Sequence, residues 1–124
     1  MSIVQIKVPW KQCSFSVVVE SPLGRIQVHA IRIPPGCTNG NIKIETLNAI
    51  HNHLRYKIVI PCILCGDFNT PQEEKEDGRI IPWGTEDWAE GELNILEGLA
   101  KFGLMEVYRY CHGFTNTKEF SWYA

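Results

Sequence analysis

Apolar side chains are gathered in short runs along the chain, and the spacing within each run predicts its secondary structure. Residues 14–20 and 25–33 are rich in β-branched residues, and the Ser-Pro-Leu-Gly sequence of residues 21–24 is typical of a turn. Together they predict a β-hairpin, which the Pro-Pro-Gly sequence of residues 34–36 ends. Residues 1–10 alternate only weakly, so they form either a strand or a frayed end.

A helix and a further strand follow the hairpin. Apolar residues recur at helical spacing from Ile44 to Leu54, and Asn41 stands where an N-cap is expected. His51 and His53 are two residues apart and face different directions, so we expect no metal pair, with His51 beside the apolar stripe and His53 in solvent. Residues 57–65 predict a buried strand. Because a strand, a helix and a strand form a crossover unit, we expect the two strands to pair in parallel.

The second half of the chain predicts a long loop and a helix. Residues 70–84 are rich in charge, which is typical of a solvated loop, although a loop of this length beside Asp67 could also be a substrate-facing lid. Thr85 is expected to cap a helix that ends at Gly103. The remaining residues predict, in order, an apolar connector (104–108), a loop (111–118) and the start of a last strand (120–123).

Composition limits the classes of protein to consider. The chain has 124 residues, of which 44% are apolar and 21% charged, and this is enough for one globular domain. The formal net charge of −2 shows no basic footprint of a nucleic-acid binder, which weakens that substrate without excluding it, because a metal can supply local positive charge. No apolar run has transmembrane length, and Gln5 and Lys7 interrupt any signal-peptide core. We therefore expect a soluble cytoplasmic protein with no membrane partner.

The five cysteines are expected to be free thiols of a reducing compartment, because their number is odd. Cys62 and Cys65 have the C-x-x-C spacing of metal and redox sites. On a strand, however, residues three apart face opposite sides, so the two sulfur atoms would not meet. We interpret both as buried structural cysteines.

The apolar run of residues 57–65 ends abruptly in Gly66-Asp67-Phe68-Asn69. Gly66 permits a close approach of backbone, and in an extended chain Asp67 and Asn69 point to one side while Phe68 anchors the other. A carboxylate beside a carboxamide suits hard cations and phosphoryl chemistry. The alternative is a strand-end turn in which these two side chains only satisfy local backbone groups.

Residues 65–69 (Cys-Gly-Asp-Phe-Asn) resemble the Gly-Asp-x-Asn motif of the endonuclease/exonuclease/phosphatase family, the DNase I-like metal-dependent phosphoesterases. Residues 28–36 are similar to the family strand that ends in a proline-containing loop, and a helix follows in the family's order. Residues 120–122 (Phe-Ser-Trp) resemble the strand that precedes the final catalytic segment. The resemblance implies that residues 1–124 are a single partial domain, without the N-terminal half and the final Asp-His segment of the family.

The resemblance also implies a fold. The family fold is a four-layer α/β/β/α sandwich, so we expect an α+β chain that supplies about one mixed sheet with two covering helices. The sheet face that the second sheet covers in the family would be open and apolar. Such a face implies self-association or a complementing chain.

The resemblance assigns roles to Asp67 and Asn69, at the end of the strand of residues 57–65, and to Arg32, in the strand that ends in the proline-containing loop. Asp67 would bind Mg²⁺ or Mn²⁺ and position or deprotonate the attacking water, and Asn69 would orient that water and the phosphate. Arg32 lies where the family usually carries a Tyr or His aimed at the phosphate, and it would contact the phosphate as a charged donor.

The resemblance also involves His29, Ser121 and Trp122, whose roles are less direct. His29 is either a member of the catalytic set or a core histidine. Ser121 and Trp122 would lie at the edge of the substrate, although Trp122 could instead pack in the core. Two functions follow: metal-dependent hydrolysis of a phosphate ester, with nucleic acid among the substrates, or an inactive remnant that acts as a binding or assembly module.

Overall fold

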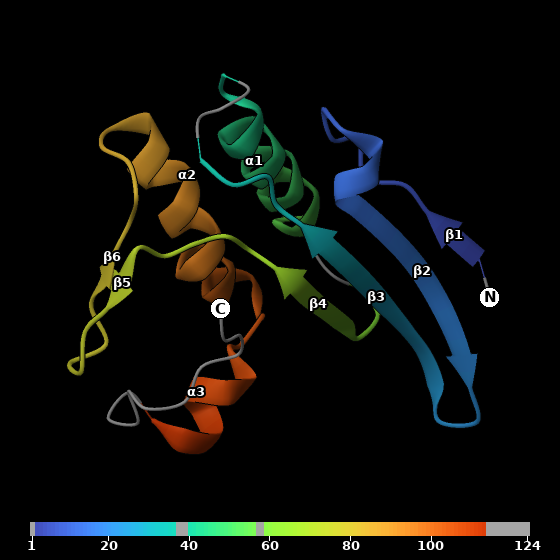
Figure 1. Cartoon of the computed structure of the whole chain (residues 1–124). Coiled ribbons are helices and arrows are strands. Elements are labelled where there is room, and N and C mark those ends of the chain that lie inside the picture. Colours follow the sequence, from blue (N-terminus) through green and yellow to red (C-terminus); the bar gives the residue numbers. More distant parts are fainter. Residues whose placement is uncertain (1, 37–39, 57–58, 114–124) are drawn as a thin grey trace.

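The computed structural model describes residues 2–36, 40–56 and 59–113 of the chain (Figure 1). Its elements are, in order, β1 (Ser2–Val4), η1 (Lys11–Cys13), β2 (Ser14–Ser21), β3 (Gly24–Arg32), α1 (Ile42–Leu54), β4 (Cys62–Asp67), β5 (Glu73–Glu74), β6 (Ile80–Ile81), α2 (Asp87–Leu96), η2 (Gly98–Phe102) and α3 (Val107–His112). The predicted α+β class and its mixed sheet are confirmed. Within the described residues no helix combines the length and apolar character needed to cross a membrane.

The main sheet has the strand order β1-β2-β3-β4. The strands β2 and β3 form the predicted antiparallel hairpin, with Val17 opposite Val28. The strands β3 and β4 are parallel, with Arg32 opposite Asp67. The helix α1 connects them, so the predicted crossover unit is also confirmed.

The strand β4 starts later than the apolar run predicts. Residues 59–61 precede the ladder, and Val59 is exposed. Pro61 has no N–H for a ladder, and only its carbonyl takes part, accepting the N–H of Gln27 at 2.8 Å. Pairing therefore begins at Cys62.

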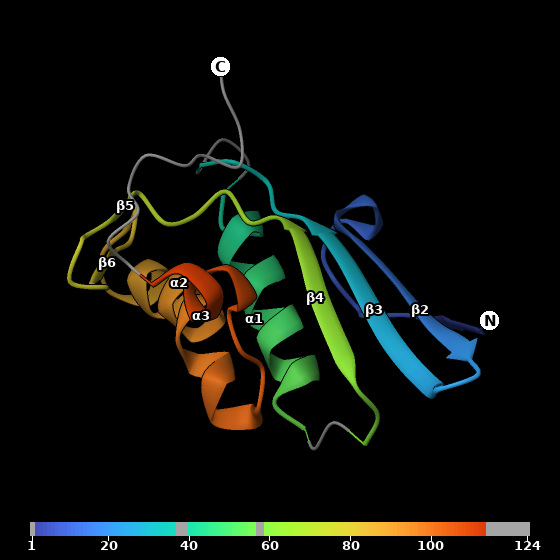
Figure 2. The same ribbon diagram turned by 90° about the horizontal axis from the view of Figure 1, so that it is seen from below.

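The two faces of the sheet differ in what covers them. Both α1 and α2 lie on one face (Figure 2), where Ile31 and Ile33 are buried in a core with side chains of α1, α2 and η2. On the opposite face, Ile3, Phe15 and Ile63 are 74%, 57% and 46% exposed. This open face carries the exposed apolar side chains that the sequence predicts, and no described element covers them.

The helices confirm some boundaries and correct others. Asn41 is the N-cap residue of α1, although its side chain makes no capping hydrogen bond. The N-cap residue of α2 is Glu86, with φ of 53°, and not Thr85. The predicted long helix is divided into α2 and η2, and Gly103 ends it in the left-handed conformation, with φ of 88°. The short helix α3 was not predicted, because residues 107–112 lack a long apolar repeat.

The described cysteines are free thiols, as predicted, but not all of them are buried. The four described cysteines, Cys13, Cys62, Cys65 and Cys111, are free. Cys62 packs against the helix-side core, whereas Cys65 is exposed on the open face, so the two thiols do point in opposite directions. The prediction that both are buried is wrong for Cys65, because no described element covers its face of the sheet.

His29 lies on the helix side of β3 and is fully buried. Its Nδ1 is hydrogen-bonded to Ser16 Oγ at 2.7 Å, and its ring meets the His53 ring edge-on, with 5.5 Å between centroids. Burial, and then the charge of the nearby His53, lower the pKa of His29 to about 4. His53 is half-buried by this contact, so the prediction that it lies in solvent is wrong.

We expect His29 to make the fold sensitive to acid. Its pKa is 6.5 in the unfolded chain and about 4 in the folded one. Between these values the unfolded chain binds the proton and the folded chain does not, so stability falls as the pH is lowered through this window. The His29 contribution to the free energy of unfolding should be about 2 kcal/mol smaller at pH ~5 than at pH ~7.5.

Urea denaturation of the wild type and of His29→Leu at both pH values measures this effect. The leucine variant should lose that part of the acid sensitivity, whereas His112→Leu, on the exposed side of α3, should behave as the wild type. An unchanged acid sensitivity in His29→Leu would contradict the assignment.

Candidate functional site

Asp67 and Asn69 come together at the edge where the parallel strands β3 and β4 both end (Figure 1). Asp67 Oδ1 accepts the backbone N–H of Asn69 at 3.0 Å, and Asp67 Oδ2 accepts the side-chain Nδ2 at 3.2 Å. The predicted juxtaposition is present, but its cause is different. Asn69 has φ of 47° and so is not extended, and the pair is held by hydrogen bonds rather than by strand alternation.

The Asn69 side chain has a fixed orientation. Its Nδ2 donates to the carbonyl of Ile33 at 2.6 Å as well as to Asp67, so both amide hydrogens are used. In this orientation Asn69 Oδ1 has no partner among the described residues and remains an acceptor. The side chain can therefore accept a hydrogen bond from water, but it has no free donor for a phosphate oxygen.

Arg32 completes this group, which we call the strand-end site (Arg32, Asp67 and Asn69). It lies opposite Asp67 in the parallel ladder, so both side chains are on the open face of neighbouring strands about 4.8 Å apart. Both residues are exposed, and within the described part of the chain the Arg32 guanidinium has no ion-pair partner. A cation and a carboxylate thus stand side by side at one edge.

The other predicted site residues are placed elsewhere. His29 precedes Arg32 by three residues and faces the helices, so β3 does not bring it to the strand-end site. His29 therefore occupies the position of a core histidine and not that of a member of the catalytic set. Ser121 and Trp122 lie outside the described residues.

Gly66 and Phe68 fix the backbone of the site. Gly66 has φ of 134°, and a Cβ at this position would overlap the carbonyl of Ile31 on the neighbouring strand. Beyond it, the carbonyl of Asp67 accepts the N–H of Ile33 at 2.7 Å, and Phe68 packs against the core. The predicted close approach and the aromatic anchor are therefore both confirmed.

Gly66→Ala should destabilise the chain more than a glycine-to-alanine substitution at a position where the added Cβ meets no other atom. Gly24 is the matched control, because its φ is also positive, 120°, and a Cβ there meets nothing within 4 Å. We expect Gly66→Ala to lower the free energy of unfolding by at least about 2 kcal/mol more than Gly24→Ala. Chemical denaturation measures both, and equal losses would show that the clash with Ile31 is relieved without cost.

The strand-end site offers one metal ligand. Among the described residues no three His, Cys, Asp or Glu side chains are grouped as a metal site. Mg²⁺ commonly binds through one or two carboxylates and completes its shell with water and substrate phosphate oxygens. The exposed carboxylate of Asp67 could therefore serve as the single protein carboxylate of such a Mg²⁺ site.

A buried ion pair supports the strand-end site from the helix side. Lys43 of α1 and Glu92 of α2 are paired with 1% and 0% of their side chains exposed. Lys43 Nζ also donates to the main-chain carbonyl of Asn69 at 2.9 Å, and Glu92 Oε2 accepts the N–H of Trp83 at 2.7 Å. The pair thus connects two helices to the two loops beside the site.

The ion pair was not predicted from the sequence, although the position of Lys43 in the helix indicates that its side chain is buried. Lys43 stands four residues before Leu47 and seven before Ile50, which places it on the buried stripe of α1. A lysine in that position must find a partner or leave the core. Its partner is 49 positions away in sequence, and no local pattern indicates Glu92.

Removing either member of the ion pair should strongly destabilise the chain. Lys43→Met or Glu92→Gln leaves the other side chain buried without its full set of partners, and we expect each to lower the free energy of unfolding by about 3–5 kcal/mol. The matched control is Lys75→Met, which removes an ion pair whose side chains are 40% and 53% exposed and should change stability by less than about 1 kcal/mol.

Urea denaturation of the single variants and of Lys43→Met/Glu92→Gln gives the coupling energy. The double variant should be less destabilised than the sum of the single variants, since each single change strands the other group. Additive losses would contradict a role of these two side chains as one unit.

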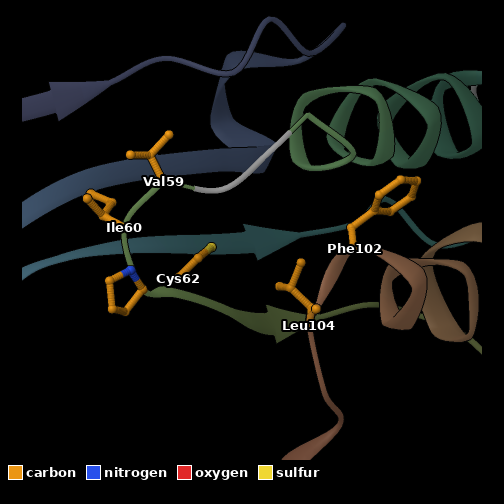
Figure 3. Close-up of a pocket in the computed structure, with 7 residues that line it drawn as sticks. Val59, Ile60, Cys62, Phe102 and Leu104 are labelled. Carbon is orange, nitrogen blue, oxygen red and sulfur yellow. The ribbon is translucent and has the colours of Figure 1, made fainter.

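The described residues line pockets beyond both ends of β4. One, of about 570 Å³, lies beside Asn69 and Lys43. The other, of about 320 Å³, lies at the opposite end of β4 (Figure 3), among Val59, Ile60, Cys62, Phe102 and Leu104. Its free thiol is that of Cys62, and burial raises the pKa of that thiol, which opposes reactivity. The pocket beside Asn69 adjoins the strand-end site, because Asn69 belongs to both.

No protein-family model, curated protein or solved structure matches the chain. The likeness to the endonuclease/exonuclease/phosphatase family accordingly rests on the motif residues and on the order of the elements.

Proposed function

We propose that the chain hydrolyses phosphate esters in a metal-dependent reaction at the strand-end site. One observation carries this proposal: the exposed carboxylate of Asp67 is hydrogen-bonded to Asn69 and stands beside the exposed Arg32 in the parallel ladder. A base, a water-orienting amide and a phosphate-binding cation are the groups that such a hydrolysis needs.

Each group has a distinct role in this proposal. Asp67 accepts a proton from the attacking water, and Asn69 Oδ1 accepts the second hydrogen of that water and so directs its lone pair. Arg32 binds the non-bridging phosphate oxygens. Asp67 would hold Mg²⁺ or Mn²⁺, and the bound metal would supply positive charge for the phosphoryl oxygens.

The substrate class is a phosphate ester, with nucleic acid as one member. The chain has a formal net charge of −2, so Arg32 and the metal would provide the local attraction for an anionic substrate. The open edge of the sheet gives an extended phosphodiester room to approach, because the side chains of Arg32 and Asp67 are exposed.

Hydrolysis of bis(p-nitrophenyl) phosphate with Mg²⁺ tests the proposal. Asp67→Asn keeps the shape of the side chain and removes the base, so kcat/KM should fall by about 100-fold or more. Asp77→Asn, which changes an exposed carboxylate near the β5–β6 hairpin, should leave kcat/KM unchanged. Equal rates in the wild type and in Asp67→Asn would refute the proposal.

The second candidate function is that of a binding or assembly module, and the open face of the sheet favours it. Ile3, Phe15 and Ile63 together expose apolar surface on three strands, and such patches mark interaction sites. In the proposed four-layer α/β/β/α sandwich, this is the face on which the second sheet would pack, supplied by a complementing chain or a second copy. Absence of metal-dependent hydrolysis in the wild type would favour this candidate over the first.

A further inference from the structure

Asn69 is held from two sides of the molecule. On the sheet side, its N–H and its side-chain Nδ2 both donate to the carboxylate of Asp67, and Nδ2 also donates to the carbonyl of Ile33. On the helix side, Lys43 Nζ donates to the main-chain carbonyl of Asn69 at 2.9 Å. Among the described residues only Oδ1, the atom proposed to accept a hydrogen from the attacking water, has no partner.

The backbone of Asn69 needs these contacts to keep its conformation. Its φ of 47° lies in the left-handed region, which is disfavoured for residues other than glycine. Such a conformation persists only where the surrounding structure determines it. Loss of the Lys43 bond would release the carbonyl end of the residue, so the backbone could leave the left-handed region and carry Oδ1 with it.

Glu92 determines where the Lys43 ammonium group lies. The two side chains are 1% and 0% exposed, so the charge of Lys43 has almost no contact with solvent and stays with its carboxylate partner. Glu92 is itself held through its second oxygen, which accepts the N–H of Trp83 at 2.7 Å. The ammonium group therefore meets the Asn69 carbonyl at a defined point, unlike the flexible ammonium group of a surface lysine.

The spacing of α1 and α2 sets the geometry of this ion pair. Gly91 precedes Glu92 and Ile44 follows Lys43, and the two neighbours are in close contact. A Cβ on Gly91 would lie 2.9 Å from Ile44 Cγ2, so a side chain at residue 91 would push the helices apart beside the pair. The close approach at Gly91 thus helps the ion pair to reach the Asn69 carbonyl.

We propose that Lys43 and Glu92 are positioning residues for the reaction, because they hold Asn69 in the conformation that directs Oδ1 at the attacking water. Neither residue needs to touch the substrate. This role rests on the proposed function and extends it to the helix layer. It differs from a purely structural role, in which the pair would stabilise the fold but would not change the rate per folded molecule.

The decisive variant removes the pair without leaving a buried charge. In Lys43→Met/Glu92→Leu two apolar side chains replace the two charges, and such replacements of buried ion pairs are often neutral or stabilising. The variant should stay folded, with a urea midpoint close to that of the wild type, and yet lose the hydrogen bond to the Asn69 carbonyl. The matched control is Lys75→Met/Glu73→Leu, which makes the same changes in an exposed ion pair.

The side-chain amide of Asn69 reports its position without any reaction. Both hydrogens of Nδ2 are hydrogen-bonded, so in the ¹⁵N spectrum of the wild type their signals should differ from those of the exposed Asn52. In Lys43→Met/Glu92→Leu the Asn69 signals should move towards those of Asn52, and in the control variant they should stay in place. Asn69→Ser assigns the signals, because they are lost in that variant.

Hydrolysis of bis(p-nitrophenyl) phosphate with Mg²⁺ measures the effect on the rate. Lys43→Met/Glu92→Leu should lower kcat by at least about tenfold and leave KM within about twofold, because Arg32 still binds the phosphate while the water is no longer directed. The control variant should keep both constants. A loss of stability alone would not lower the kcat of a variant that is fully folded in the assay.

Gly91→Ala is a second variant that keeps both charges. It separates the helices beside the ion pair, so it should shift the Asn69 side-chain signals and lower kcat by about threefold. Its result decides the matter should the double variant fail to fold.

Two results would overturn the inference: Asn69 signals that stay in place in a folded Lys43→Met/Glu92→Leu or Gly91→Ala variant, or a kcat of the folded double variant equal to that of the wild type. The two proposals fail separately. Shifted Asn69 signals in a chain without hydrolytic activity count against the proposed function alone. Hydrolysis with an unaltered kcat in the double variant counts against the positioning role alone.

Discussion

The buried ion pair of Lys43 and Glu92 is the constraint on which the rest of the structure depends. Taking two charges out of water is expensive, and the pair is tolerable only because further hydrogen bonds satisfy it. Those bonds go to the carbonyl of Asn69 and the N–H of Trp83. The requirement to satisfy the pair therefore fixes the packing of α1 on α2 and, at the same time, the loops that border the strand-end site and the adjoining pocket.

The sheet supplies the complementary constraint from its other side. Parallel pairing sets Arg32 against Asp67, and strand alternation sends both side chains to the open face while Ile31 and Ile33 enter the core. Gly66 allows the two strands to approach where any side chain would collide. The charged groups thus reach the same edge through backbone geometry, without a direct ion pair between them.

The parts of the fold that the sequence predicted are those decided by neighbours along the chain. The hairpin, the crossover unit and the close approach at Gly66 all follow from local residue types. Prediction failed where distant packing decides: Cys65 is exposed because its sheet face is open, and Glu92 is buried because Lys43 needs it. All three residues of the strand-end site were predicted as site residues, but the support that the helices give to the site could not be predicted from the sequence.

The two interpretations of Asp67 and Asn69 are compatible. The bond from the Asn69 N–H to Asp67 Oδ1 is the local turn contact that a purely structural role requires. The same turn places Asn69 in the left-handed conformation and directs Nδ2 to Asp67 and Ile33, which leaves Oδ1 for a water molecule. A turn that satisfies the backbone is therefore also what orients the amide, so the presence of the turn does not argue against a chemical role for these residues. What separates the two interpretations is the carboxylate itself, because the turn needs only an acceptor at Asp67, whereas hydrolysis needs a base.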